Sequence, residues 1–422
     1  MSCSISECLS QAGGRVRLLE THDITSTEII RNVIGSDGKT QFHGQWVSGL
    51  TQTTILGVPD TELITPLCRA NLISIHEGVD GKPTERRELC TAFDADSGGP
   101  IEEIPALVAT LARKGVSVII IEDKEVFEPG KKVNSLAASS ASQGQANPQE
   151  FAKVMTAFND AKKHGCQEHM LVTARIESFT CRKVIKNDPC AEAASVKDAL
   201  RQALDRAMIY RDAGADAIMI HSKSKSPDEV LSFLRQFRAQ DSKTPLVIVP
   251  TTYGTAHEDT LYEAGANIII YANHMMRAKI RAVDEYLASG AAETQQVWPA
   301  SLTVAADTRN FGYLLQSLQR IKAGDMQGSF NAGTDDFLAN AERASYRAME
   351  ETARRLLDFK QAGAADDTII LVKDLLAING VHLSDLGRPQ EDEVSTDIFM
   401  RLMSRLRTRT THVLRNGSRW FA

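Results

Sequence analysis

Two aspartates, Asp94 and Asp96, stand one residue apart at the end of the apolar stretch CTAFDADSGGP (residues 90–100), directly before a pair of glycines. In a strand, residues i and i+2 share a face, so both carboxylates can point the same way. Their mutual repulsion lowers stability unless a cation lies between them, and a hard divalent ion would supply it. The alternative is that one aspartate caps a helix that starts near Ile101 while the other is solvated.

Short apolar, β-branched runs alternate along the chain with segments of helical period, which predicts βα units and a parallel sheet. We expect eight strands, within residues 15–23, 44–49, 89–96, 116–123, 169–177, 217–222, 245–251 and 267–273. This pattern predicts an α/β protein with a (β/α)8 TIM-type barrel, and an open doubly wound sheet is the alternative. The barrel is assigned to residues 1–300, and a helical C-terminal region to 301–422, with amphipathic segments at 334–363 and 396–416.

Polar side chains follow the predicted strands at their carboxyl ends, where the chemistry of such barrels takes place. These residues are Asp23, Ser48, Asp94, Asp96, Glu122, Asp123, Arg175, Glu177, His221, Ser222, Thr251 and Asn273. Converging carboxylates without a Cys/His pair favour Mg²⁺ or Mn²⁺ over zinc. Because Arg175 and His221 add positive charge nearby, the predicted substrate is a small anion that carries carboxylate or phosphoryl groups.

The composition excludes several other classes. The chain has 422 residues and a formal net charge of −6, and the charge pattern argues against a nucleic-acid partner. Seven scattered cysteines without a CxxC pair indicate reduced thiols and a cytoplasmic location. Neither a signal-peptide core nor a run of about 18 apolar residues is present, so we expect no membrane partner.

Eight short motifs, in this order, resemble one known family. They are QWVSGL (45–50), LGVPD (56–60), FDADSGG (93–99), IEDK (121–124), KVNSL (132–136), ARIES (174–178), MIHSK (219–223) and IVPT (248–251). This set is similar to the phosphoenolpyruvate mutase branch of the isocitrate lyase superfamily. The resemblance implies a Mg²⁺-dependent barrel, with Mn²⁺ as a substitute, that forms a homo-oligomer, a dimer or a tetramer, in which C-terminal helices exchange between subunits.

The resemblance also implies roles for individual residues. Asp94 matches the aspartate that binds the metal directly. Three further carboxylates match residues that reach the ion through water, namely Asp60, Asp96 and Glu122. The residues expected to contact the substrate are Trp46, Ser48, Gly49, Leu50, Asp60 and Lys124. The expected catalytic residues are the phosphoryl-binding Arg175 and His221, together with Lys132, Asn134 and Ser135 on a mobile loop.

The activity that the resemblance implies is the interconversion of phosphoenolpyruvate and phosphonopyruvate, with the loop excluding water. Asn134 favours this mutase over phosphonopyruvate hydrolases, which resemble it but carry Thr at that position. A C–C bond lyase or hydrolase acting on a 2-oxo or 2-hydroxy acid is disfavoured, because no cysteine lies between Cys90 and Cys166. A barrel without catalysis, serving as a binding or assembly subunit, is the remaining alternative.

Three features depart from the family pattern. The spacer EVFEPGKKV (125–133) is longer than expected, GGP (98–100) stands where GYG is usual, and an insertion follows Glu177. We expect the first two to alter loop closure and a contact near the metal.

Overall fold

The fold is a closed barrel of eight parallel strands in sequential order, with β1 paired to both β2 and β8. The computed structural model describes residues 4–56, 60–73, 87–125, 132–135, 143–165, 169–286 and 335–360. The strands are β1 (Val16–Thr21), β2 (Gly44–Val47), β3 (Cys90–Asp94), β4 (Val118–Glu122), β5 (Leu171–Ile176), β6 (Ala217–Ile220), β7 (Leu246–Ile248) and β8 (Ile268–Tyr271). The predicted (β/α)8 barrel is therefore confirmed, and each strand lies inside the segment expected for it.

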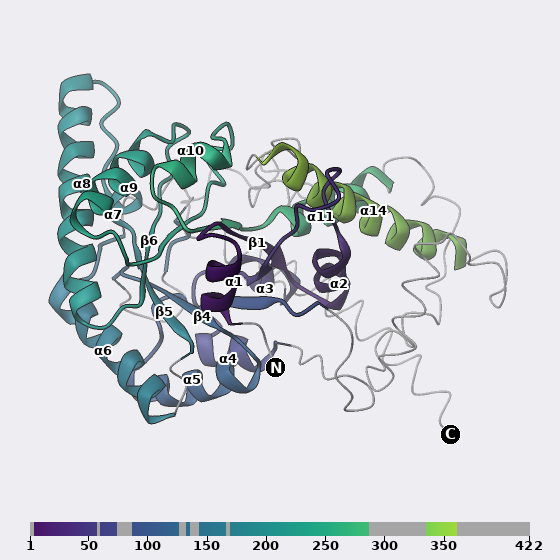
Figure 1. The fold of residues 1–422 in the computed structure, drawn as a ribbon, viewed down its shortest axis with the longest axis horizontal. Helices are drawn as coiled ribbons and strands as arrows, with labels where there is room; N and C mark the ends of the chain where they lie inside the picture. Colours follow the sequence, from purple (N-terminus) through teal and green to yellow (C-terminus); the bar gives the residue numbers. More distant parts are fainter. Residues whose placement is uncertain are drawn as a thin grey trace, which may run out of the picture.

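The protein has twelve helices in its described residues, most of which surround the barrel and cover the outer faces of its strands (Figure 1). They are α1 (Ile5–Gln11), α2 (Ile24–Asn32), α3 (Gly49–Leu56), α4 (Pro66–Asn71), α5 (Ile104–Arg113), α6 (Pro148–His164), α7 (Ser178–Cys181), α8 (Pro189–Asp212), α9 (Asp228–Gln240), α10 (Glu258–Glu263), α11 (His274–Tyr286) and α14 (Asp335–Phe359). A 3-10 turn, Ile101–Glu103, precedes α5. The insertion after Glu177, residues 181–195, begins at the last residue of α7 and extends into the start of the long helix α8.

The strands are almost uniformly apolar because they contribute to two separate cores. In β4, Ile119 and Ile121 face the surrounding helices, whereas Val118 and Ile120 fill the interior of the barrel. The interior core also includes Ile5 from α1, which therefore packs against the inside of the barrel. Both faces of each strand are dry, so polar side chains collect at the strand ends.

Helix α14 packs on the barrel of its own chain, beside α11 and α2 (Figure 1). Asp358 accepts hydrogen bonds from the backbone and the hydroxyl of Ser36, and Arg354 donates to the carbonyl of Ile34. The helix predicted in residues 334–363 is thus confirmed. Exchange of C-terminal helices between subunits is a property of an oligomer and stays a prediction. The domain boundary at residue 300 and the amphipathic segment 396–416 lie outside the described residues.

The turn after β3 requires glycine at position 98. Gly98 has a φ of +91°, and a Cβ at this position would lie 2.8 Å from Cε2 of Phe158 and 3.3 Å from Cγ2 of Ile121. The sequence GGP therefore has a packing role of its own, because α6 approaches this turn through Phe158.

We predict that Gly98→Ala lowers the free energy of unfolding by about 2–4 kcal/mol, from backbone strain plus overpacking. Gly38→Ala is the matched control, since Gly38 also has a positive φ (+68°) but no atom lies within 4 Å of its added Cβ. The control should lose only about 1–2 kcal/mol, from the backbone alone. Urea unfolding measures both variants, and equal losses would contradict the packing role.

Candidate active site

The carboxyl ends of the strands enclose a small cavity of about 70 Å³ at the mouth of the barrel. Most of the residues that the sequence predicts for the site line it, namely Trp46, Ser48, Leu50, Asp60, Asp94, Lys124, Lys132, Asn134, Ser135, Arg175 and His221. Gly49, Asp96 and Glu122 are not in the lining, but each contacts a residue that is. Thr251 and Asn273 also line the cavity, whereas Asp23 is the N-cap of α2. The predicted residues are therefore brought together, while their roles stay predictions.

Asp94 is a buried carboxylate without a close cation. Its Oδ2 accepts a hydrogen bond from the backbone of Gly49 at 3.3 Å, and its one ion pair among the described residues is with Arg175, at 3.7 Å. Burial and the neighbouring Asp96 carboxylate raise the pKa of Asp94. Neither aspartate caps a helix near Ile101, because the N-cap residue of that turn is Pro100 and no side chain caps it. The capping interpretation of this stretch is therefore wrong.

Asp96 lies between two side-chain cations. Nη2 of Arg69 donates to its Oδ2 at 2.5 Å, and Nζ of Lys132 donates to its Oδ1. Burial alone would raise the pKa of Asp96, but the charges of Arg69 and Lys132 outweigh it and hold the pKa well below its usual range. Asp96 is thus already neutralised by the chain itself, unlike Asp94.

Arg175 joins two further carboxylates at the ends of β4 and β5. Its Nη2 lies 2.7 Å from Oε2 of Glu122, and its Nε donates to Glu177. Glu177 also accepts from Thr180 and lies 3.3 Å from Nδ1 of His221. Burial would raise the pKa of Glu177, but the charge of Arg175 outweighs it and lowers that pKa well below its usual range. Glu177 thus orients both side chains that are expected to bind a phosphoryl group.

The described part of the loop, residues 132–135, lies over the cavity. Nζ of Lys124 donates to the carbonyl of Val133 at 2.8 Å and to Oγ of Ser135 at 2.5 Å. Arg175 donates to the same hydroxyl at 2.8 Å, and Nδ2 of Asn134 donates to Asp60 at 2.7 Å. The described part of the loop is therefore bonded to residues of the mouth at several points.

The donor set suits a hard divalent cation that a single carboxylate ligates directly. Among the residues that the structure describes, no three His, Cys, Asp or Glu side chains already surround a metal position. Asp94 is nevertheless buried, its one ion pair among the described residues is 3.7 Å long, and burial together with Asp96 raises its pKa. Glu122, by contrast, already lies 2.7 Å from Arg175 and 3.2 Å from Lys132, so a further cation would be most stabilising beside Asp94.

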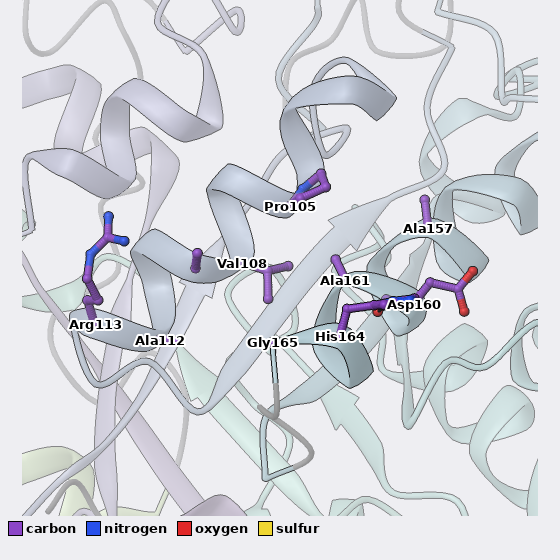
Figure 2. A pocket seen from close by; sticks show the side chains of 10 residues that line it. Pro105, Val108, Ala112, Arg113, Ala157, Asp160, Ala161, His164 and Gly165 are labelled. Atoms are coloured by element: carbon purple, nitrogen blue, oxygen red, sulfur yellow. Dashed lines mark hydrogen bonds between the residues drawn. The ribbon is translucent and has the colours of Figure 1, made fainter.

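A larger hollow of about 660 Å³ lies elsewhere, between α5 and α6 on the outside of the barrel. Figure 2 shows that Val108 and Ala112 of α5 and Ala157, Ala161 and His164 of α6 border it. Alanine side chains make up much of its lining, and carboxylates do not converge there as they do at the mouth. We therefore assign the chemistry to the smaller cavity.

Sequence reasoning missed two residues of the site. Glu177 was recognised only as a polar strand end, although its place in ARIES, two residues after Arg175, puts it on the same side of β5. Arg69 gave no signal, because it lies in the short helix α4 and meets Asp96 only in the folded chain.

A closed parallel barrel with carboxylates and cations around a cavity at the carboxyl ends of its strands has the architecture of a (β/α)8 enzyme. Residues 5–290 match the family model described as phosphoenolpyruvate phosphomutase, so the chain belongs to that family. The family expected from the sequence is therefore confirmed.

Known relatives agree with this assignment. The chain is 31% identical over 269 residues to phosphoenolpyruvate phosphomutase from Tetrahymena pyriformis, covering 64% of this chain and 76% of the relative. It is 29% identical over 249 residues to phosphonopyruvate hydrolase from Variovorax sp. (strain Pal2), covering 58% of this chain and 74% of the relative. The solved structure of phosphoenolpyruvate phosphomutase from Streptomyces platensis subsp. rosaceus is 28% identical, with a TM-score of 0.54, covering 75% of this chain and 97% of that one.

Phosphoenolpyruvate phosphomutases are isomerases, so the expected enzyme class is confirmed. In the part of the chain that the structure describes, no helix is long and apolar enough to cross a membrane.

We predict that Glu177→Gln lowers the free energy of unfolding by about 3 kcal/mol, because it removes the buried carboxylate that pairs with Nε of Arg175 and lies beside His221, and leaves only Glu122 close to Arg175. Glu150→Gln is the control, since Glu150 pairs with Lys153 on α6 and the Glu150 side chain is 65% exposed. The control should change stability by at most about 0.5 kcal/mol. Urea unfolding at pH 7 measures both, and equal effects would contradict the role given to Glu177.

Proposed function

We propose that this protein is a Mg²⁺-dependent phosphoenolpyruvate mutase that interconverts phosphoenolpyruvate and phosphonopyruvate. The observation that carries the proposal is the cavity at the barrel mouth, which Asn134 and Ser135 of the loop line together with Arg175, His221 and Asp94. Membership of the family supports it, as do relatives that bear this activity in their names.

In this proposal, the pyruvyl part of the substrate lies against Trp46, Ser48 and Leu50 at the end of β2. The phosphoryl group lies on the opposite side, where Arg175 and His221 offset its charge. Glu177 holds both of these side chains through the contacts described above. Mg²⁺, when bound beside Asp94, would stabilise negative charge on the enolate oxygens.

The reaction conserves all atoms of the substrate. The bond between phosphorus and the C2 oxygen breaks, the phosphoryl group stays with Arg175, His221 and Ser135, and a bond from phosphorus to C3 forms with the electron pair of the enolate. No residue has to transfer a proton. The chain's main task is to exclude water, since water at this stage would release phosphate, and the bonds from Lys124 and Arg175 to Ser135 hold the loop closed.

Hydrolysis of phosphonopyruvate to pyruvate and phosphate is the second candidate. The similarity to the Variovorax hydrolase, which is nearly as strong as that to the mutases, favours it. Asn134 favours the mutase, because its amide is bonded to Asp60 across the closed mouth. C–C bond cleavage is less well supported, since the sequence has no cysteine in the loop.

We predict that purified protein converts phosphonopyruvate to phosphoenolpyruvate in the presence of Mg²⁺. Phosphorus NMR of the reaction mixture measures this conversion. Inorganic phosphate with pyruvate would instead identify a hydrolase, and an unchanged substrate would contradict both. Asp94→Asn should lower the rate at least about 100-fold, whereas Asp198→Asn should not, because Asp198 is exposed on α8. Activity of Asp94→Asn close to the wild-type rate would refute the metal assignment.

A further inference from the structure

Arg69 is a fully buried arginine next to the acidic turn, and nothing in the proposed reaction uses it. The side chain has no exposed area, although arginine is among the residues least often buried without a partner. It extends from α4 over the ring of Phe93, with the guanidinium carbon 5.1 Å from the ring centroid. Because desolvating such a charge is costly, its contacts must be favourable and specific.

Two of the contacts of Arg69 hold the end of β3, and a third reaches Gln52 on α3. Nη2 donates to the carbonyl of Asp94 at 2.7 Å and to Oδ2 of Asp96 at 2.5 Å, while Nη1 donates to Oε1 of Gln52 at 2.9 Å. Asp96 has a φ of +48°, a conformation that is uncommon for residues other than glycine. Arg69 therefore holds both the backbone and the carboxylate of a turn that is unfavourable by itself.

The second carboxylate oxygen of Asp96, Oδ1, faces the loop. With Oδ2 held by Arg69, Oδ1 receives Nζ of Lys132, which also lies 3.2 Å from Oε1 of Glu122. Only 4% of Lys132 is exposed, so its ammonium is buried beside these two carboxylates. Asp96 is thus a bridge between α4, which belongs to the barrel, and the segment 132–135, which covers the substrate.

We propose that Arg69 is a positioning residue that fixes the Asp96 carboxylate in the orientation that receives Lys132, and that closure of the loop depends on it. This inference rests on the proposed function in one respect only, namely that closure of the loop serves to exclude water from the reaction. Asp96 then serves the loop, while Asp94 is left to hold the metal.

The test uses trypsin on the native protein. Cleavage after Lys132 requires this side chain to leave Asp96 and enter the protease, so its rate reports how often the loop opens. Arg69→Met should raise that rate about tenfold or more, because one side of a buried charge bridge is lost. Arg69→Lys keeps the charge but loses the fork that reaches three acceptors, and its rate should lie in between. Mass spectrometry quantifies the peptides that end at Lys132.

Arg238→Met is the matched control. Arg238 is also partly buried and donates to several acceptors, among them the carbonyls of Gly265 and Thr244, but it lies near the amino ends of β7 and β8. It should lower overall stability without faster cleavage at Lys132. If the control and Arg69→Met raise cleavage equally, Arg69 is only structural and the proposal fails.

A double-mutant cycle that combines Asp96→Asn with Arg69→Lys completes the test. It does not depend on Arg69→Met, so it still tests the proposal if that variant fails to fold. Asp96→Asn alone should expose Lys132 to trypsin, and adding Arg69→Lys should have little further effect, because both act through one bridge. Additive effects would overturn the proposal.

Product analysis then separates this inference from the proposed function. In an active mutase, Arg69→Lys should release more phosphate per phosphoenolpyruvate formed, and an unchanged ratio would contradict the role of Arg69 in excluding water. If no variant converts phosphonopyruvate, the proposed function fails while the cleavage rates still decide the role of Arg69.

Discussion

The structure depends on the compensation of opposite charges in a dry barrel mouth. Carboxylates at the ends of β3, β4 and β5 are buried, and each buried charge needs a partner to offset the loss of water. Arg69, Lys132 and Arg175 supply most of that charge from α4, the loop and β5. Among the described residues, Asp94 has only the longer contact with Arg175, at 3.7 Å, and this weaker compensation is the physical basis for proposing a metal ion beside it.

The barrel makes this arrangement possible because its strands are apolar on both faces. Layers of buried apolar side chains such as Val118 and Ile120 fill the interior beneath the mouth. The charged side chains therefore lie directly above a packed apolar core, where electrostatic interactions are stronger than in water. A loop bonded to the same charges can then complete the enclosure.

The sequence predicted the strands well, because hydrophobic runs and strand-end polar residues are local signals. The motifs also predicted most of the residues that line the cavity at the mouth. The sequence could not predict Arg69, because its contact with Asp96 joins residues 27 positions apart and follows no periodicity. The packing need at Gly98 was equally invisible, since it arises from Phe158 on another helix. Long-range pairing of this kind follows from tertiary packing, which propensity and spacing do not encode.

The most direct test of the account is a crystal structure of the protein grown with Mg²⁺ and oxalate, a stand-in for the pyruvate enolate. The account predicts one ion at the mouth, with a carboxylate oxygen of Asp94 bound to it and Asp96 still bridging Arg69 and Lys132. A mouth that holds oxalate without any ion, or an Asp94 side chain turned away from the ion, would contradict it.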